Sequence, residues 1–351
     1  MLNSNYCLIT GASEGFGKAL ALECASRNMN LILVALPGPE LHYLADFIKR
    51  NYKVEVMALE ADLTAEESYY YIFDTVNKMK WQINMLINNA GIGNTQLFSD
   101  GSINFYQKQV KLNVMATTLL THLFLDMLKN NGPAYILNVG SLCSFFFLAK
   151  KQVYGATKSF IYFFSKSLRR ELENDNVHVS VICPGGMNTN ASVTLLNRNC
   201  GWLCKLAVKN PEDVALIAID GLLKGREVII PGTVNKLFLL FNNLIPVSLK
   251  KMITNRQMKV LNSAPVGKSA AIVPMITPSL IVANYVTLQY KHKKFNYCKE
   301  TFFRQRLHDG TLLKRKEKFA CQHNITSNLY PENNLPSLPS FFFKQRCVTN
   351  K

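Results

Sequence analysis

The stretch Tyr6-Cys-Leu-Ile-Thr10-Gly-Ala-Ser-Glu-Gly-Phe-Gly17 is a short apolar run that leads into three closely spaced glycines. The apolar run predicts a buried strand and residues 16–28 predict a helix, which places Gly11, Gly15 and Gly17 in the turn between them. Glycine lets the backbone approach a ligand closely, and the free N–H groups of the following helix attract an anion. The stretch therefore predicts a pyrophosphate-binding turn, although its G-x-x-x-G-x-G spacing differs from the usual G-x-G-x-x-G fingerprint.

A second informative stretch, Tyr154-Gly-Ala-Thr-Lys158, begins 13 residues after Ser141. Residues four apart on a helix lie on one face, so the ammonium of Lys158 is expected beside the phenol of Tyr154. A nearby cation lowers the pKa of a tyrosine from about 10 toward neutrality, where proton transfer is most effective. Tyr154 and Lys158 are therefore candidates for acid–base chemistry.

The rest of the first 262 residues alternates between predicted strands and predicted helices. Apolar runs typical of strands covered on both faces occur at residues 31–35, 54–60, 85–88, 135–139, 177–183 and 228–230. A capping-box pattern at Thr64 predicts the start of one helix, and Asn210-Pro211 predicts the start of another. This alternation predicts an α/β fold, a Rossmann-type doubly wound parallel sheet in a single domain, with ligands at the carboxyl ends of the strands.

In this order and spacing the motifs resemble the short-chain dehydrogenase/reductase family, from about residue 5 to about residue 262. Beyond those already quoted, the matching motifs are Asp62, Asn88-Asn-Ala-Gly-Ile-Gly93, Asn113, and Pro184-Gly185 with Thr189. The resemblance implies an NAD(P)-dependent oxidoreductase that transfers a hydride between a nicotinamide cofactor and a carbonyl or alcohol group.

The resemblance also implies a role for each of four catalytic residues. Tyr154 would exchange a proton with the carbonyl oxygen, and Lys158 would bind the nicotinamide ribose and lower the pKa of the phenol. Ser141 would donate a hydrogen bond to the carbonyl, and Asn113 would hold a water that relays protons to Lys158. Taken singly, a tyrosine is usually a packing residue and a serine after a strand is usually a cap, so the catalytic interpretation rests on their joint spacing.

The cofactor-binding residues follow from the same resemblance. They are Gly11, Ser13, Glu14, Gly15, Phe16, Gly17, Leu36, Asp62, Leu63, Asn89, Ala90, Gly91, Tyr154, Lys158, Pro184, Gly185 and Thr189. In this family Asp62 would hold the adenine amino group, and the backbone of residues 89–91 would lie against the adenosine ribose.

The choice between NAD and NADP stays open at the end of the second predicted strand. An NAD-dependent enzyme would place a carboxylate there, and an NADP-dependent enzyme would place arginine or lysine there or before the second turn glycine. This chain has Ala35, Leu36 and Pro37 at the first position and Glu14 at the second. The missing carboxylate favours NADP slightly, whereas the charge of Glu14 would disfavour a 2′-phosphate.

Apolar residues gather in the loops that would surround a substrate, at residues 145–148, 193–208 and 237–249. They fit an apolar carbonyl or alcohol substrate and, equally well, packing within the domain or against a second subunit of a homo-oligomer. The chain also resembles family members that act on 3-oxoacyl or steroid-like ketones, which is an analogy at the level of the family.

The 351-residue chain contains nine cysteines. No basic and apolar leader opens the chain, and the cysteines show neither disulfide-framework nor zinc spacing, so we expect a cytoplasmic protein with reduced thiols and no metal site. Cys200 and Cys204 lie four residues apart and are interpreted as small packing residues.

Residues 263–351 form a basic C-terminal extension beyond the motif-bearing domain of residues 1–262. The extension has 14 Lys and Arg against 4 Asp and Glu, a net charge of +10, and residues 1–262 carry the remaining +7. We expect the extension to be largely disordered and solvated, with no specific nucleic-acid partner. Contact between the extension and a membrane surface is the less favoured alternative. An alternative function is a catalytically silent dinucleotide-sensing or nucleic-acid-binding protein that uses this extension. The intact set of Asn113, Ser141, Tyr154 and Lys158 favours the enzyme.

Overall fold

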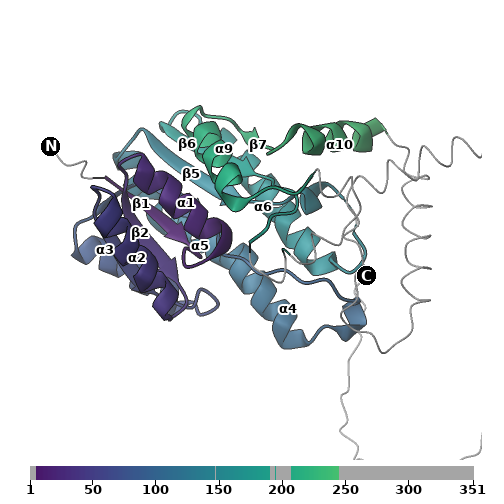
Figure 1. Ribbon diagram of the computed structural model, residues 1–351, viewed down its shortest axis with the longest axis horizontal. Coiled ribbons are helices and arrows are strands. Elements are labelled where there is room, and N and C mark those ends of the chain that lie inside the picture. The colour runs from purple at the N-terminus through teal and green to yellow at the C-terminus, as the bar shows by residue number, and fades with distance from the viewer. Residues whose placement is uncertain (1–4, 147, 190–193, 195–206, 245–351) are drawn as a thin grey trace, which may run out of the picture. The chain divides into compact units, whose positions relative to one another are not determined.

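Seven parallel strands form one sheet in the order β3-β2-β1-β4-β5-β6-β7 (Figure 1). The computed structural model describes residues 5–146, 148–189, 194 and 207–244. In sheet order the strands are Val56–Glu60, Asn30–Ala35, Asn5–Thr10, Gln82–Asn88, Ala134–Val139, Val177–Ile182 and Val228–Ile229. The strand order reverses at β1, which pairs with β2 on one side and with β4 on the other. This reversal defines a doubly wound Rossmann-type sheet and confirms the predicted fold class.

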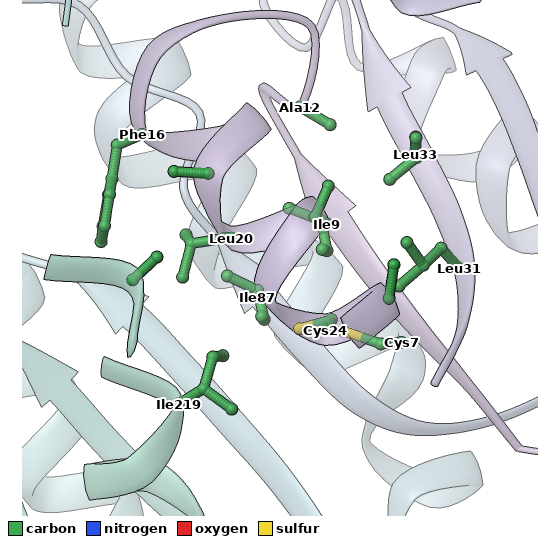
Figure 2. Packing of buried hydrophobic residues seen from close by; sticks show 14 of the residues in the cluster. Cys7, Ile9, Ala12, Phe16, Leu20, Cys24, Leu31, Leu33, Ile87 and Ile219 are labelled. Atoms are coloured by element: carbon green, nitrogen blue, oxygen red, sulfur yellow. The ribbon is translucent and has the colours of Figure 1, made fainter. Parts of the chain in front are cut away.

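Helices cover both faces of the sheet, which explains why its strands are continuous apolar runs. The helices on one face are α1 (Gly15–Ser26), α2 (Pro39–Asn51) and α9 (Pro211–Leu223). Those on the other face are α3 (Glu67–Lys78), α5 (Ala116–Asn130) and α6 (Gln152–Glu171). Figure 2 shows the first core layer, where Cys7 and Ile9 of β1 lie under Leu20 and Cys24 of α1, with Ile219 of α9 beside them.

The expected element boundaries need small corrections. Strand β3 begins at Val56, two residues later than expected, and β6 and β7 each end one residue earlier. The capping box predicted at Thr64 is wrong, because the Thr64 hydroxyl donates to Asp62 Oδ1 at 2.8 Å and α3 begins only at Glu67. Helix α9 begins at Pro211, as Asn210-Pro211 predicted, although the Asn210 side chain makes no capping hydrogen bond.

Three consecutive helical segments form one long run between β4 and β5. It comprises α4 (Ile103–Val110), the π-helical turn η2 (Lys111–Met115) and α5. Ser102 caps α4 by accepting a hydrogen bond from Phe105 N at 3.2 Å. Turns with this wider winding often mark functional sites, and Asn113 lies in the middle of η2. The remaining elements are η1 (Phe98–Asp100), η3 (Leu142–Phe145) and α10 (Thr233–Leu244).

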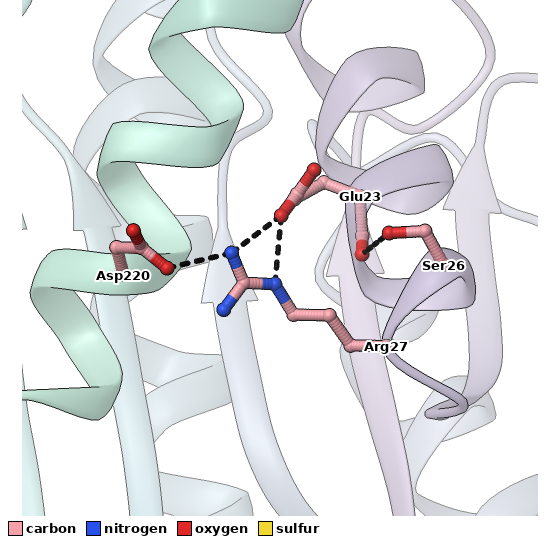
Figure 3. Close-up of polar contacts among 4 residues, drawn as sticks. All are labelled: Glu23, Ser26, Arg27 and Asp220. Atoms are coloured by element: carbon pink, nitrogen blue, oxygen red, sulfur yellow. Dashed lines mark hydrogen bonds and ion pairs between the residues drawn. The ribbon is translucent and has the colours of Figure 1, made fainter.

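An ion-pair network ties α1 to α9 across one face of the sheet (Figure 3). Arg27 donates from Nε to Glu23 Oε1 at 2.7 Å and from Nη2 to Asp220 Oδ1 at 2.7 Å. The hydrogen bond from Arg27 lowers the pKa of Asp220 below its usual range. The network therefore braces the helix that follows the glycine turn.

Replacing Arg27 with methionine is expected to lower the midpoint of thermal unfolding by about 2 °C, because partly exposed ion pairs are worth little individually. Since the pKa of Asp220 is depressed in the folded state, the difference from wild type should be full above a pH of about 4 and should shrink as Asp220 becomes protonated. Thermal unfolding at several pH values checks this. The control is Arg50→Met, at an exposed position of α2; equal losses in both variants would contradict the brace.

All described residues belong to one compact unit, Met1–Lys294. The expected boundary after residue 262, the basic extension 263–351, and residues Phe147, Cys200 and Cys204 lie outside the described residues. Within the described part, no helix is both long enough and apolar enough to cross a membrane. The same part contains no group of three or more His, Cys, Asp or Glu side chains suited to a metal ion.

Candidate active site

The glycine turn joins β1 to α1 in a conformation that only small residues tolerate. Gly11 and Gly15 have φ of 63° and 55°, in the left-handed region. A Cβ added to Gly17 would lie 1.9 Å from the carbonyl oxygen of Gly11. Glu14 precedes α1 without capping it through its side chain, so its carboxylate does not take up the N–H groups of the first helical turn. The residues present thus fit a pyrophosphate group.

The predicted cofactor contacts Ser13 and Phe16 lie in different surroundings. Ser13 is part of the turn and is half-buried, whereas the Phe16 side chain packs into the core between α1 and the sheet. Only the backbone of Phe16 therefore faces a ligand. Thr189, which follows β6, lies over Gly15, because a Cβ added to Gly15 would lie 3.2 Å from the Thr189 Cβ.

Thr10 and Asn89 lock the turn to the loop after β4. The Asn89 amide donates to the carbonyl oxygens of Thr10 at 2.9 Å and Gly11 at 3.0 Å. The Thr10 hydroxyl accepts from the backbone N–H groups of Asn89 and Ala90, both at 3.0 Å. Asn89 therefore shapes the site through its side chain. Thr10 was missed at the sequence level, where a threonine ending a strand carries no distinctive signal.

The expected adenosine end of the site lies where β2 and β3 end. Leu36 follows β2 and is 57% exposed. Glu60 pairs with Ala35 across the two strands, and its Oε1 accepts from Gly38 N at 3.2 Å and contacts His42 Nε2 at 3.0 Å. The hydrogen bond from Gly38, aided by His42, lowers the pKa of Glu60. A carboxylate missing from β2 is thus present on the neighbouring strand.

Asp62 and Leu63 follow β3 at the same edge. Asp62 Oδ1 accepts from Thr64 N at 2.9 Å and from the Thr64 hydroxyl. Burial would raise the pKa of Asp62, but the hydrogen bonds from Thr64 outweigh burial and lower it. Asp62 is therefore ionised at neutral pH and suited to accept from an amino group, while Leu63 is buried.

The three residues expected to carry the chemistry meet beyond β5. Ser141 caps η3 and accepts from Cys143 N at 3.1 Å, which leaves its own O–H to donate. Tyr154 and Lys158 lie one turn apart on α6, and Lys158 Nζ is 5.9 Å from the centroid of the Tyr154 ring. Lys158 is 5% exposed and donates to the Val139 carbonyl oxygen at 2.6 Å. The structure thus places the phenol of Tyr154 near the ammonium of Lys158 and the hydroxyl of Ser141, while the catalytic roles of these three residues stay a prediction.

The expected direction of the phenol pKa is wrong for this structure. Burial raises the pKa of Tyr154 above its usual range, the Cys143 thiol adds to the increase, and the hydrogen bond with Ser141 only partly opposes it. Burial also lowers the pKa of Lys158 to about 8. Desolvation therefore outweighs the attraction between cation and phenolate, and Tyr154 is a protonated acid at neutral pH.

Asn113 is wholly engaged with its neighbours through its side chain. Its Oδ1 accepts from Ile92 N at 2.8 Å, and its Nδ2 donates to Ile92 O at 2.9 Å and to Thr157 Oγ1 at 3.0 Å. Gln109, one turn earlier, also donates to Ile92 O, at 3.2 Å. The water relay expected of Asn113 stays a prediction, while the loop-holding role of Gln109 had no signal in the sequence.

Pro184 and Gly185 close the site after β6. The Pro184 carbonyl oxygen accepts from Leu142 N at 2.9 Å, which joins this loop to the one that carries Ser141. Gly185 packs against Asn235 of α10, because an added Cβ would lie 3.0 Å from the Asn235 Nδ2. The Asn235 amide also donates to Pro231 O at 2.7 Å and lies 3.4 Å from Ala207 O. Asn235 was missed because its contacts join distant parts of the chain.

The apolar residues predicted around the substrate are only partly within the described chain. Phe145 stacks edge-to-face on Tyr162 of α6 with ring centroids 4.7 Å apart, and Phe146 is 9% exposed. An apolar pocket lies at the beginning of α6, beside α4, and includes Val110, Val153 and Phe160. Both observations suit the predicted alternatives of an apolar substrate and a subunit contact.

A doubly wound sheet whose carboxyl edge brings a glycine turn together with a half-buried tyrosine and a buried lysine is typical of dinucleotide-dependent oxidoreductases. Residues 5–199 match the short chain dehydrogenase family, and the chain belongs to this family. This membership confirms the family and fold predicted from the motifs.

The chain is similar to two curated proteins and one solved structure of known short-chain dehydrogenases and reductases. It is 30% identical over 194 residues to a 3-oxoacyl-acyl-carrier-protein reductase of Aquifex aeolicus, covering 55% of this chain and 78% of that protein. It is 29% identical over 196 residues to the 17-beta-hydroxysteroid dehydrogenase type 3 of Homo sapiens, covering 55% of this chain and 62% of that protein. A solved short-chain dehydrogenase from Sphingobium yanoikuyae, in complex with NADPH, is 25% identical with a TM-score of 0.59, covering 76% of this chain and 99% of that one.

Proposed function

We propose that the chain is an NADP(H)-dependent oxidoreductase that transfers a hydride between the nicotinamide and a carbonyl or alcohol group of an apolar substrate, such as a 3-oxoacyl or steroid-like ketone. The observation that carries the proposal is the meeting of Ser141, Tyr154 and Lys158 beside the Gly91–Gly93 loop. Similarity to a 3-oxoacyl reductase and to a hydroxysteroid dehydrogenase supports the substrate class.

The residues of this chain perform the proton half of the reaction. When bound, the nicotinamide supplies or accepts the hydride. In reduction, Tyr154 donates its proton to the carbonyl oxygen, which becomes the hydroxyl of the product, and the Ser141 hydroxyl donates a hydrogen bond to the same oxygen. Lys158 holds a ribose hydroxyl and stabilises the phenolate that forms. Oxidation of an alcohol reverses these steps.

The preference for NADP(H) rests on two observations. No carboxylate follows β2 directly, and the Glu60 carboxylate on β3 already has Gly38 N and His42 as partners. The NADPH complex of the Sphingobium protein shows that a similar fold accepts this cofactor. Glu14 lies exposed at the turn, where its side chain has room to point into solvent.

Two statements about the setting of the enzyme belong to the same proposal. The described cysteines Cys7, Cys24, Cys143 and Cys183 are free thiols, which supports a cytoplasmic location. The exposed apolar side chains of Phe160 and Phe163 on α6 support a homo-oligomer. The alternative of a silent dinucleotide sensor or nucleic-acid-binding protein rests on the basic extension alone.

A substrate screen tests the proposal. The full chain is mixed with NADH or NADPH and with apolar ketones, including a 3-oxoacyl thioester and a steroid ketone, and loss of the reduced nicotinamide absorbance is followed. We expect turnover of an apolar ketone with NADPH that exceeds turnover with NADH. If neither cofactor is oxidised with any ketone, nor its oxidised form reduced with the matching alcohols, the proposed activity is wrong.

Replacing Leu36 with arginine is expected to strengthen NADP binding about tenfold and leave NAD binding unchanged. The new guanidinium would meet the 2′-phosphate, and a charge-assisted hydrogen bond contributes about 1.5–3 kcal/mol. We expect the lower end of this range because Glu60, held beside Gly38, competes for the guanidinium. Dissociation constants from cofactor fluorescence check this, with Leu36→Met as the uncharged control. Equal changes for NAD and NADP would show that Leu36 does not face the 2′-phosphate.

A further inference from the structure

Gln109 is a fully buried polar side chain, and within the described chain only one of its two amide groups is hydrogen-bonded. It lies on α4, is 0% exposed, and donates from Nε2 to the Ile92 carbonyl oxygen at 3.2 Å. Its Oε1 is also buried and has no hydrogen-bond partner among the described residues. An unpaired buried acceptor destabilises a protein, whereas an apolar residue of the same shape is close to neutral. The amide therefore needs an explanation beyond packing.

Side chains bond both backbone polar groups of Ile92, the partner of Gln109. Ile92 donates its N–H to Asn113 Oδ1 at 2.8 Å, and its carbonyl oxygen accepts from Asn113 Nδ2 at 2.9 Å as well as from Gln109. Gln109 and Asn113 lie four residues apart along α4 and η2, so both amides approach Ile92 from the same helical run. The backbone of Ile92 is thus clamped by two side chains.

The residues on either side of Ile92 lie against the catalytic pair. A Cβ added to Gly91 would lie 3.4 Å from Lys158 Nζ, and one added to Gly93 would lie 3.1 Å from the ring of Tyr154. Asn113 also bonds the hydroxyl of Thr157, the residue before Lys158. Movement of Ile92 would therefore displace the backbone that packs against both Tyr154 and Lys158.

We infer that Gln109 is a positioning residue that acts through the Ile92 carbonyl to hold the Gly91–Gly93 loop against Tyr154 and Lys158. The inference rests on the proposed function for its catalytic consequence, but the clamp itself is a property of the chain. The loop shields the phenol and ammonium from water, so loosening it should relax their desolvation. The other titratable groups around this pair are Lys151, Cys143 and Cys183.

The test is the variant Gln109→Met, which keeps the length of the side chain and removes the amide. Its control is Gln107→Met, the same change at an exposed position of α4. We expect Gln109→Met to unfold at the same temperature as wild type or a higher one, since the unpaired acceptor is gone. Amide hydrogen exchange in residues 91–93 should become faster in Gln109→Met and stay unchanged in Gln107→Met.

With an apolar ketone and NADPH, kcat of Gln109→Met should fall about 10-fold to 100-fold, because small misplacement of catalytic groups is costly. KM for the cofactor should change by a smaller factor, because Gly91 is only one of the predicted cofactor contacts. The pH profile of kcat should also move, since water that reaches Lys158 returns its pKa from about 8 toward the ordinary value. A purely structural side chain would change the unfolding temperature and leave this pH profile in place.

The outcomes separate the inference from the proposed function. Unchanged exchange in residues 91–93 overturns the clamp, whether or not any ketone is turned over. Faster exchange with unchanged kcat and pH profile overturns the positioning role. If wild type turns over no ketone, the proposed function fails, and the role of Gln109 is then decided by the exchange of the Ile92 amide, compared between Gln109→Met and Gln107→Met.

Discussion

A Tyr154→Phe protein is expected to fold and to bind the dinucleotide as wild type does, while its turnover falls by roughly 10²–10⁴. The substitution removes one hydroxyl and keeps the ring that packs against Gly93. The carbonyl oxygen then loses its proton donor, and Ser141 can only donate a hydrogen bond. Turnover is measured with the ketone and cofactor found in the screen, and dinucleotide affinity by fluorescence.

Tyr162→Phe is the matched control for this prediction. Tyr162 lies on the same helix, contacts Phe145 through its ring, and loses the same hydroxyl. We expect this variant to keep wild-type turnover within a few fold. A Tyr154→Phe protein with turnover close to that of Tyr162→Phe would rule out the phenol as the proton donor.

The pKa of Tyr154 bears on the direction of the reaction. Since burial raises the pKa of Tyr154, the phenol is protonated at neutral pH and ready to donate. The sequence suggested the opposite, because spacing along a helix shows that an ammonium is near but not that both groups are dry. Lys158 also donates to the carbonyl oxygen of Val139, which lies on a strand 19 residues earlier and so is not apparent from spacing along the helix. In the protonated form Tyr154 is suited to reduction.

Features that depend on local spacing were predictable from the chain. The glycine turn is local because the left-handed φ of Gly11 and Gly15 and the close approach at Gly17 need glycine within a single turn. Tyr154 and Lys158 share a helix face for the same kind of reason. The sheet followed from apolar runs alternating with helical segments.

Features that depend on long-range contacts were not predictable. Thr10 meets Asn89 across 79 residues, and Gln109 meets Ile92 where a loop folds back on a helix. Glu60 reaches the end of β2 only through the pairing of β3 with β2. No pattern in one sequence gives the register of such contacts, because each joins two elements that the pattern describes separately. For this reason the sequence named Leu36 as the selectivity position and missed Glu60 beside it.

Replacing Lys158 with methionine is expected to stop catalysis, weaken dinucleotide binding and change how stability depends on pH. The pKa of Lys158 is about 8 in the folded protein and about 10.5 when unfolded. Below pH 8 both states are protonated, and the folded state bears the full cost of a buried charge. Between pH 8 and 10.5 the unfolded state binds more protons than the folded one, so stability rises with pH.

The lysine therefore costs the folded protein stability at neutral pH, on the order of 3 kcal/mol from the size of the pKa shift. Methionine removes this cost but leaves the Val139 carbonyl oxygen without its donor, which offsets part of the gain. We expect Lys158→Met to be at least as stable as wild type at pH 7. The rise in stability between pH 8 and 10.5, measured by chemical denaturation, should be smaller in the variant.

Lys151→Met is the control, because Lys151 also lies over the Tyr154 ring, with Nζ 5.3 Å from its centroid, but is only half-buried. This variant should keep most of its dinucleotide affinity and the wild-type rise in stability with pH. A Lys158→Met protein that loses activity and is also destabilised at pH 7, with an unchanged pH dependence, would show that Lys158 supports the fold. Retained stability with lost activity would instead mean that this buried charge is kept for the reaction at the expense of stability.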